Sequence, residues 1–242
     1  MKIAIIGYGK MGKAIEEIAV AKGHEIILKI DAANTSDFTK ENIQNADVAI
    51  EFTGPQSAFE NITKCIQWGV PVVSGSTGWL DNFEKAKKLC EEKKGCLLYA
   101  SNFSIGVNLF FEINKQVAAL MEPYDNYDVS MTEIHHTEKK DAPSGTAISL
   151  AEQILAKIGR KNKWVNEPSN ESSNEASNLI IRSERIDPAP GTHSIIYNSP
   201  IDSIEIKHTA HTRKGFAGGA VLAAEFVHKK IGIFTMSNVL GL

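Results

Sequence analysis

Short apolar runs and amphipathic stretches alternate along the chain up to residue 103. Residues 3–6 form an uninterrupted apolar run, which predicts a buried strand. Residues 11–21 carry apolar side chains at helical spacing, and Gly23 is placed to end that helix. Further strands are predicted at 25–30, 47–53, 71–74 and 96–100. Further helices are predicted at 56–68, 82–94 and 103–121. This alternation is typical of βαβ units around a parallel sheet.

The pattern changes after Tyr124. A strand is predicted at 127–133 and an amphipathic helix at 144–158, with Gly159 placed to end it. A polar run at 166–178 predicts a loop. Three strand-like stretches follow, at 179–184, 193–197 and 203–209. Consecutive strands without intervening helices favour an antiparallel or mixed sheet, with the preceding helix covering one face.

Together the two patterns predict an α/β protein of two domains. The first is a Rossmann-type parallel-sheet domain made of residues 1–103 and 214–242, because an Ala-rich helix predicted at 215–230 is expected to pack back on it. The second, residues 104–213, is an α+β domain with a mixed or antiparallel sheet.

Composition narrows the function classes. The 242 residues are 43% hydrophobic and carry 26 basic and 29 acidic side chains, a net charge of −3, so no nucleic-acid footprint is expected. No stretch reaches the roughly 18 apolar residues of a membrane span. Cys65, Cys90 and Cys96 lack disulfide or metal spacing, and the apolar run at the N-terminus is too short for a signal peptide. A cytoplasmic protein is expected.

The first candidate site is the turn Gly7-Tyr-Gly-Lys-Met-Gly12, which follows a predicted strand and opens a helix. This is the context of a dinucleotide-binding turn, whose glycines permit a tight turn, backbone approach to the pyrophosphate and close helix–strand packing. Asp31 lies at the end of the next strand, where an acidic residue binds the adenosine ribose. The residues predicted to bind the cofactor here are Gly7, Tyr8, Gly9, Lys10, Met11, Gly12 and Asp31.

The same residues bear on the choice of cofactor. Asp31 would repel a 2′-phosphate, and Ala32 offers no guanidinium to hold one, whereas Lys10 could compensate in part. The sequence therefore favours NADH, with NADPH tolerated.

The second candidate site is the segment 133–147, Glu-Ile-His-His-Thr-Glu-Lys-Lys-Asp-Ala-Pro-Ser-Gly-Thr-Ala. His135 can exchange a proton near neutral pH, and Lys139 can polarise or protonate a substrate nitrogen. Residues 144–146 begin a helix, whose free N–H groups favour a carboxylate. A small anionic substrate with a protonatable centre is implied. The alternative is that the histidines are ordinary loop residues, Lys139 and Lys140 a solvated pair, and 144–146 only a helix cap.

This segment resembles the signature of the 4-hydroxy-tetrahydrodipicolinate reductases, or dihydrodipicolinate reductases. Three other family elements occur in order, namely Gly75-Ser-Thr-Gly78, Ala100-Ser-Asn-Phe-Ser-Ile-Gly-Val-Asn108 and Arg213-Lys-Gly-Phe-Ala-Gly-Gly-Ala220. The chain departs from the pattern in its short link from Asp31 to Asp47, and at 182–192, where the family has a glycine-rich approach to the Gly-Thr-His turn.

The resemblance implies NAD(P)H-dependent reduction of a cyclic imine dicarboxylate in diaminopimelate and lysine biosynthesis. It implies that 1–103 with 214–242 binds the dinucleotide, and that 104–213 binds substrate and assembles a homotetramer through its sheets. His135 and Lys139 would be the acid/base pair, and Arg213 would lie at the domain hinge. Substrate carboxylates would be held by His136, Gly145 and Thr146. The nicotinamide half of the cofactor site would be lined by Gly75, Ser76, Thr77, Ala100, Ser101, Asn102 and Phe103.

Other functions are weighed against this interpretation. A semialdehyde dehydrogenase needs a cysteine nucleophile beside its cofactor, and the three cysteines fall in predicted helices or at a strand start. A zinc site combining His135 or His136 with His208 or His211 lacks convincing spacing, so no metal is predicted. A non-catalytic NAD(H)-sensing module could keep the glycine turn, but would have no reason to hold His135 and Lys139 together.

Overall fold

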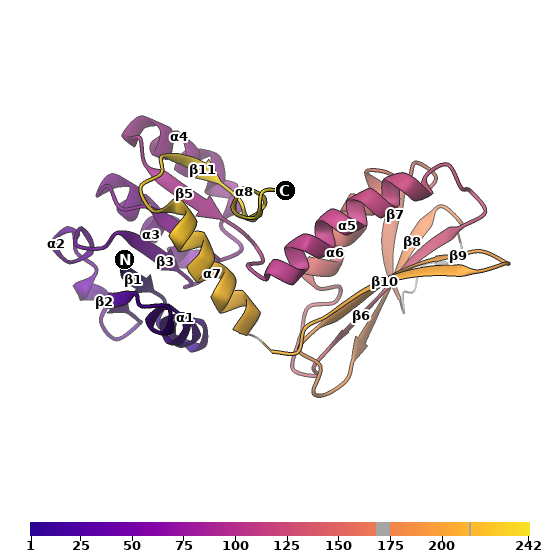
Figure 1. The fold of residues 1–242 in the computed structure, drawn as a ribbon, viewed down its shortest axis with the longest axis horizontal. Coiled ribbons are helices and arrows are strands. Elements are labelled where there is room, and N and C mark those ends of the chain that lie inside the picture. Colours follow the sequence, from indigo (N-terminus) through magenta and orange to yellow (C-terminus); the bar gives the residue numbers. More distant parts are fainter. Residues whose placement is uncertain (168–174, 213) are drawn as a thin grey trace. The chain divides into compact units, whose positions relative to one another are not determined.

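The protein was analysed as a computed structural model, which describes residues 1–167, 175–212 and 214–242. The chain forms two compact units (Figure 1). The first combines Met1–Ile105 with Lys214–Leu242, and the second is Gly106–Arg213. The residue predicted to lie at the hinge, Arg213, is outside the described residues.

The first unit is built on a parallel six-stranded sheet in the order β11-β5-β4-β3-β1-β2. Its strands are β1 (Lys2–Ile6), β2 (Glu25–Ile30), β3 (Val48–Glu51), β4 (Val72–Ser74), β5 (Cys96–Tyr99) and β11 (Gly232–Phe234). Successive side chains of a strand point to opposite faces, so Ile3 and Ile5 join one core while Ala4 and Ile6 join another. The central strands are thus buried on both faces, which explains their continuous apolar runs.

Helices cover both faces of this sheet. The first core contains side chains of α1 (Lys10–Ala21), α7 (Lys214–Val227) and α8 (Met236–Leu240). The second contains side chains of α3 (Pro55–Gln67) and α4 (Phe83–Lys93). Short helical turns complete the unit, namely η1 (Thr35–Asp37), α2 (Lys40–Ile43) and η2 (Leu80–Asn82). The C-terminal helix α7 therefore packs on the same sheet as the N-terminal strand.

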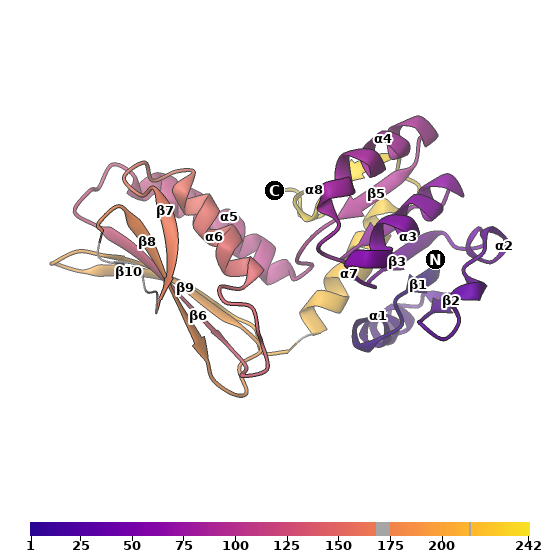
Figure 2. The same ribbon diagram turned by 180° about the vertical axis from the view of Figure 1, so that it is seen from behind.

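The second unit is a mixed five-stranded sheet in the order β10-β9-β6-β8-β7, with helices on one face (Figure 2). Its strands are β6 (Asp128–His135), β7 (Lys163–Glu167), β8 (Asn178–Arg185), β9 (Thr192–Asn198) and β10 (Ser203–Thr209). The central strand β6 pairs parallel with β8 and antiparallel with β9. The helices are α5 (Ile105–Met121) and α6 (Gly145–Leu155), which share one core with the sheet.

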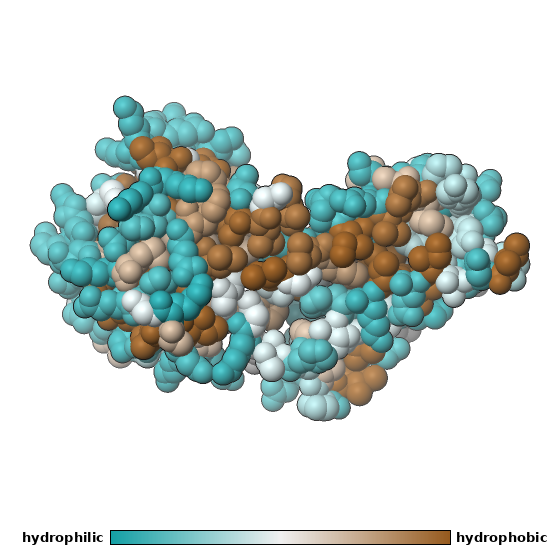
Figure 3. Space-filling model, viewed as in Figure 1, coloured by the Kyte–Doolittle hydropathy of each residue, from teal (hydrophilic) through white to brown (hydrophobic). Residues whose placement is uncertain are grey.

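Apolar side chains also gather on the outer side of α5 (Figure 3). Leu109, Ile113 and Leu120 are exposed there, although the opposite side of the helix buries Phe110 and Ala118. The strongly apolar sequence of this helix is therefore not explained by the core of its own unit alone.

Several elements differ from the sequence prediction. The strand β7 was not predicted, and its end occupies the start of the run 166–178 that was expected to be a loop. It is an edge strand that buries only Val165 fully, so its sequence carries little apolar signal. The strand β11 and the helix α8 were also missed, because each is very short. Within the predicted loop, residues 168–174 lie outside the described residues. The helix α6 ends at Leu155 with Ala156 as its C-cap, so Gly159 does not terminate it.

A buried lysine holds the start of β6 to the start of β8. Lys161 Nζ donates to the carbonyl oxygens of Ala176 at 2.7 Å and Asn178 at 2.8 Å, and it pairs with Asp128 Oδ1 at 2.6 Å. We expect Lys161→Met to lower the free energy of unfolding by about 1–3 kcal/mol, because two carbonyls lose a charged donor. Urea denaturation would measure the loss. The exposed Lys157→Met is the control, and an equal loss in both variants would contradict the assignment.

Candidate functional site

The three glycines of the turn in the first unit, Gly7, Gly9 and Gly12, differ in what surrounds them. Gly7 has φ +99°, and a Cβ there would lie 2.1 Å from the carbonyl oxygen of Phe52. A Cβ on Gly12 would lie 2.5 Å from the carbonyl oxygen of Gly7, so this position brings α1 against the turn. A Cβ on Gly9, the N-cap of α1, would meet no atom within 4 Å. The turn is therefore packed inward at two glycines and open outward at the third, where a ligand can approach its backbone.

Beside this turn lies a cavity of about 650 Å³. Four of the predicted cofactor residues line it, namely Gly7, Tyr8, Gly9 and Asp31. Another part of its wall is formed by Thr35 and Phe38 from the short link after β2, and by Ser57, Glu60, Asn61 and Lys64 from α3. The short link thus still supplies an aromatic side chain to this wall.

Asp31 is exposed at the carboxyl end of β2. Its Oδ1 accepts a hydrogen bond from the N–H of Ala33 at 2.7 Å, and its own N–H donates to Asn34 Oδ1 at 2.8 Å. Lys29, on the same strand, donates to Glu16 at 3.1 Å and lies 5.0 Å from the centre of the Tyr8 ring. The carboxylate at the cavity is therefore held in place by its turn, and the nearest lysine on its strand is already paired.

A buried carboxylate, Glu51, organises the next two strand ends. It accepts hydrogen bonds from Ser74 Oγ at 2.6 Å, Ser76 Oγ at 2.9 Å and the N–H of Thr53 at 3.0 Å. Ser76 was predicted to line the cofactor site, and Glu51 was missed, although a charge in the apolar run 48–51 is an available signal. Phe103, also predicted there, is only 2% exposed and belongs to the core, so its ring is packed away from solvent.

The three cysteines do not offer a nucleophile. All are buried, with Cys65 and Cys90 inside α3 and α4 and Cys96 at the start of β5. Burial raises the pKa of Cys96 to about 12, and burial also raises the pKa of Cys65 and of Cys90. Protonated thiols of this kind do not support the cysteine chemistry of a semialdehyde dehydrogenase.

In the second unit, sheet register brings His135 into a buried polar cluster. His135 and Glu133 are two residues apart on β6, so their side chains point to the same face of the sheet. Glu133 stands directly opposite Ser183 on β8 and His193 on β9. The rings of His135 and His193 are 5.1 Å apart and edge to face. Long-range strand pairing thus assembles groups that are widely separated in sequence.

The imidazole of His135 is 7% exposed. Its Nδ1 lies 3.4 Å from Glu133 Oε2 and has no hydrogen-bond partner among the described residues. Gly191 lies against the other side of the ring, since a Cβ there would be 3.1 Å from Nε2. Burial lowers the pKa of His135, with Lys139 and Arg185 acting in the same direction and Glu133 opposing them. Burial and His135 together lower the pKa of His193 to about 4.

The predicted lysine is paired in this structure. Lys139 Nζ donates to both carboxylate oxygens of Asp141, at 2.9 and 2.8 Å. Burial raises the pKa of Asp141, but the hydrogen bonds and the charge of Lys139, together with smaller contributions from the backbone and His135, outweigh it, and the pKa is lowered. Arg185 fastens the loop, donating to the carbonyl oxygens of Lys139 at 3.2 Å and Asp141 at 2.6 Å. Asp141 and Arg185 were not assigned roles from the sequence.

The helix start predicted to hold a carboxylate is well formed. Ser144 is the N-cap of α6, and its Oγ accepts from the N–H of Ala147 at 3.2 Å. The N–H of Ser144 itself donates to Glu133 at 3.1 Å. A Cβ on Gly145 would meet no atom within 4 Å, so an anion can approach the backbone at this point of the first turn.

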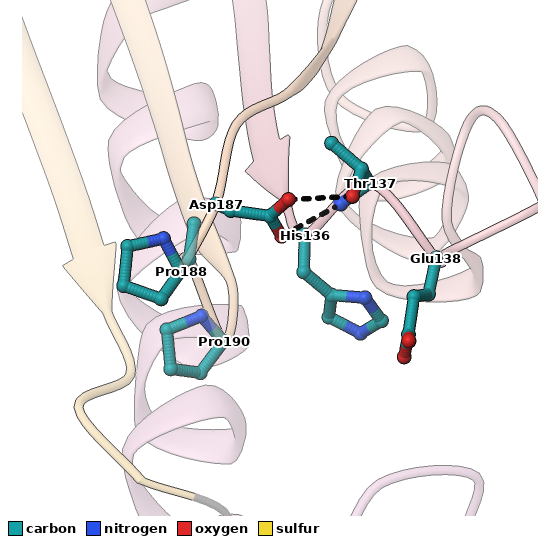
Figure 4. A pocket seen from close by; sticks show the side chains of 7 residues that line it. His136, Thr137, Glu138, Asp187, Pro188 and Pro190 are labelled. Carbon is teal, nitrogen blue, oxygen red and sulfur yellow. Dashed lines mark hydrogen bonds between the residues drawn. The ribbon is translucent and has the colours of Figure 1, made fainter.

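His136 does not join His135. It lines a separate cavity of about 290 Å³ with Thr137, Glu138 and the 187–190 segment (Figure 4). Asp187 closes one wall, accepting from Thr137 Oγ1 at 2.6 Å and from the Thr137 N–H at 3.1 Å. Adjacent residues at a strand end face opposite ways, which is why His135 joins the buried cluster whereas His136 lines a cavity.

Among the described residues, Glu133, His135 and His193 have potential metal-ligand atoms within 4.8 Å of one another. The sequence predicted no metal, and the histidine pairs weighed there are different. Two features disfavour a dication at this cluster. Glu133 already accepts a hydrogen bond from Ser183 at 2.8 Å, and Arg185 places a guanidinium nitrogen 3.3 Å from its Oε1. The cluster is better suited to holding protons.

Both units match family models of known proteins. A family model described as "Dihydrodipicolinate reductase, N-terminus" matches residues 1–103, and one described as "Dihydrodipicolinate reductase, C-terminus" matches residues 106–240. A 4-hydroxy-tetrahydrodipicolinate reductase of Christiangramia forsetii is 46% identical over 242 residues, covering 99% of this chain and 98% of that protein. One of Neisseria meningitidis is 32% identical over 267 residues, covering 100% and 98%.

Among solved structures, a dipicolinate-bound dihydrodipicolinate reductase from Paenisporosarcina sp. TG-14 has a TM-score of 0.76 at 23% identity, covering 97% of each chain. An amine dehydrogenase from Mycobacterium smegmatis has a TM-score of 0.62 at 13% identity, covering 98% of this chain and 95% of that one. The family resemblance and the fold class predicted from the sequence are confirmed. In the part of the chain that the structure describes, no helix is long and apolar enough to cross a membrane.

Proposed function

This chain belongs to the dihydrodipicolinate reductase family, and we propose that it reduces 4-hydroxy-tetrahydrodipicolinate to tetrahydrodipicolinate with a pyridine nucleotide, in diaminopimelate and lysine biosynthesis. The reduction adds a hydride and a proton, and the 4-hydroxyl group leaves as water. The observation that carries the proposal is the arrangement of the second unit. His135 and Lys139 interact electrostatically, and the open start of α6 is tied through Ser144 to the same carboxylate that His135 faces.

The first unit fits a dinucleotide. The open backbone at Gly9, the free N-terminus of α1 and the cavity beside them suit a pyrophosphate and its adenosine. The cofactor supplies the hydride when it is bound. The protein positions it through the glycine turn, and Ser76, held by Glu51, is proposed to lie on the nicotinamide side with Gly75, Thr77 and residues 100–103.

The second unit is proposed to bind a small dicarboxylate. The N–H groups of Gly145 and Thr146 at the start of α6 receive one carboxylate. The ammonium of Lys139, released from Asp141, faces the reacting centre and delivers a proton as hydride arrives. His135, the other member of the acid/base pair, replaces the proton that Lys139 gives up. The Paenisporosarcina relative was solved with dipicolinate, a dicarboxylate, which supports this class of substrate.

His136 is proposed to contact the second carboxylate, from the cavity that it shares with residues 187–190. The family match is what supports this role, because His136 and His135 face different ways in the structure.

The direct test is a coupled assay. The condensation product of pyruvate and aspartate semialdehyde is supplied, and the oxidation of NADH and of NADPH is followed separately. Turnover with either cofactor is the expected result. If the protein binds NADH but turns over with neither cofactor, the non-catalytic sensing module becomes the better description.

We propose NADH as the preferred cofactor, with NADPH accepted. Asp31 places a carboxylate at the cavity, and the cation of Lys29 is neutralised by Glu16. We expect Asp31→Ala to weaken NADH binding about 10-fold, equivalent to about 1.4 kcal/mol, and to improve the use of NADPH. The ratio of kcat/KM for the two cofactors measures this. Asp81→Ala, which removes an exposed carboxylate outside the cavity, is the control, and an unchanged ratio in Asp31→Ala would contradict the ribose role.

We also propose a homotetramer assembled through the sheets of the second unit, in the cytoplasm. The strand β10 is an edge strand and is largely exposed, including Ile204 at 43%. An exposed edge strand of this kind offers unpaired backbone groups to another copy. Light scattering coupled to size exclusion gives the mass, and a monomer at micromolar concentration would contradict the proposal.

A further inference from the structure

One buried carboxylate, Glu133, lies between the segments to which proton transfer and substrate binding are assigned. Its Oε1 accepts hydrogen bonds from Ser183 Oγ at 2.8 Å, from the N–H of Ser144 at 3.1 Å and from Arg185 Nη2 at 3.3 Å. These donors come from β8 and from the N-cap of α6. One oxygen therefore joins the central strand, its parallel neighbour and the anion-binding helix.

The second oxygen faces the histidines. Glu133 Oε2 lies 3.4 Å from His135 Nδ1 and 3.8 Å from His193 Nε2. It also accepts from the N–H of Ser144 at 3.1 Å. His193 Nε2 in turn is 3.2 Å from Ser144 Oγ. The side chain of Glu133 is 1% exposed, so these contacts take place away from solvent.

We propose that Glu133 is a positioning residue for the reaction. Its carboxylate lies 3.4 Å from Nδ1 without a hydrogen bond in this structure, and its negative charge favours the proton of neutral His135 on Nδ1, which leaves Nε2 as the nitrogen that exchanges protons. The same carboxylate fixes Ser144 and so the start of α6. This inference rests on the proposed function, because it names what holds the two groups assigned there.

Burying a charged carboxylate costs free energy, so the charge of Glu133 calls for a role that a neutral side chain could not fill. A neutral amide could accept hydrogen bonds from Ser183 and Ser144 without bringing a charge out of water. The negative charge acts on the imidazole of His135, whose charged form it stabilises and whose tautomer it selects. Burial alone would raise the pKa of Glu133, but the hydrogen bonds from Ser144 and Ser183 and the charge of His135 together outweigh it, so this pKa lies below its ordinary value.

The charged groups around His135 decide the sign of the expected pH effect. Lys139 and Asp141 act on His135 from the loop, and Arg185 acts on it from β8. The ring of His193, on β9, packs against that of His135, and His208, on β10, acts on His193. Among the described groups, Glu133 and Asp141 favour protonation of His135, and Glu133 is the stronger of the two. Removing its charge therefore lowers the pKa of His135, whether that residue acts as acid or as base.

The test is Glu133→Gln, which keeps the size and the acceptor oxygen but removes the charge. We expect kcat to fall about 10- to 100-fold, as for other partners that orient a functional imidazole. We expect KM to change less, and the limb of the pH–rate profile assigned to His135 to move to lower pH. Wild-type kcat with an unmoved limb would overturn the proposal.

A second variant separates positioning from folding. Lys161→Met removes a buried charge at the opposite end of β6, and it is expected to lower stability without moving the pH limb. If Glu133→Gln loses stability as Lys161→Met does, with its pH limb in place, the role of Glu133 is structural and the proposal fails. Ser183→Ala, which removes one donor to Glu133, is expected to give a smaller change in the same direction as Glu133→Gln.

A measurement without turnover keeps the inference apart from the proposed function. Nitrogen-15 chemical shifts of labelled histidine in the wild-type protein report the tautomer of His135. A proton on Nδ1 in wild type that redistributes in Glu133→Gln is the expected result. A wild-type proton on Nε2 would overturn the inference even if the reductase assay succeeds. Failure of that assay with the expected tautomer would instead count against the proposed function alone.

Discussion

We expect His135→Ala and Lys139→Ala each to lower turnover about 10²-fold or more, as lost proton transfer does. His135 is buried, and Gly191 packs closely against its Nε2. Its imidazole is therefore fixed in position. Lys139 is held in one place by Asp141, while Arg185 fastens its backbone. Alanine removes the titrating group in both cases.

Steady-state kinetics with saturating cofactor measures this result. Lys140→Ala is the matched control for the lysine, because it removes an exposed neighbouring charge from the same loop. His228→Ala serves for the histidine, since it lies in the first unit, on α7's C-terminal side. Near-normal kcat in His135→Ala or Lys139→Ala would refute the role assigned to that residue. A rise in KM alone would reassign it to binding.

The parallel sheet was predictable because its signal is local. Each central strand is an apolar run and each helix an amphipathic stretch, so every βαβ unit could be identified within a few dozen residues. The signal fails where burial is slight. The strand β7 buries only Val165 fully, and β11 is three residues long with no residue fully buried. No pattern of period two can be recognised in so few positions.

The candidate site divides in the same way. His135, Lys139 and the start of α6 lie within a dozen residues, so their spacing alone pointed to chemistry. The partners that organise them come from other strands. Ser183 and His193 meet Glu133 through strand register, which follows from the pairing of the whole sheet. The local signal for this cluster was Glu133 itself, a charged residue at a position of β6 where the alternation places a buried side chain.

The two histidines separate in the structure although they are adjacent in sequence. His135 lies in the buried cluster with Glu133, whereas His136 lines the cavity formed with Asp187 and Pro190. The departure from the family pattern at 182–192 turns out to build that cavity. The departure at 182–192 therefore changes the surroundings of His136.

We expect Gly7→Ala and Gly9→Ala to separate folding from cofactor binding. At Gly7 a methyl group would lie 2.1 Å from a backbone oxygen, in a residue with φ +99°. Backbone strain of about 1–3 kcal/mol adds to overpacking of about 1–3 kcal/mol. Gly7→Ala should therefore lower the free energy of unfolding by about 2–6 kcal/mol in these terms. This is the largest expected effect of any single methyl group on the turn.

At Gly9 the outcome is expected to be reversed. A methyl group there meets no protein atom within 4 Å, so the loss of stability should stay below about 1 kcal/mol, the scale of a changed N-cap. The same methyl group stands where we propose that the pyrophosphate approaches the backbone, and NADH affinity should fall at least about 10-fold, or about 1.4 kcal/mol. Urea denaturation without cofactor and fluorescence titration with NADH measure the two quantities on each variant. Unchanged NADH affinity in Gly9→Ala would mean that the open side of the turn is not the cofactor surface. Wild-type stability in Gly7→Ala would show that the turn can relax away from Phe52, and that its packing is looser than the structure indicates.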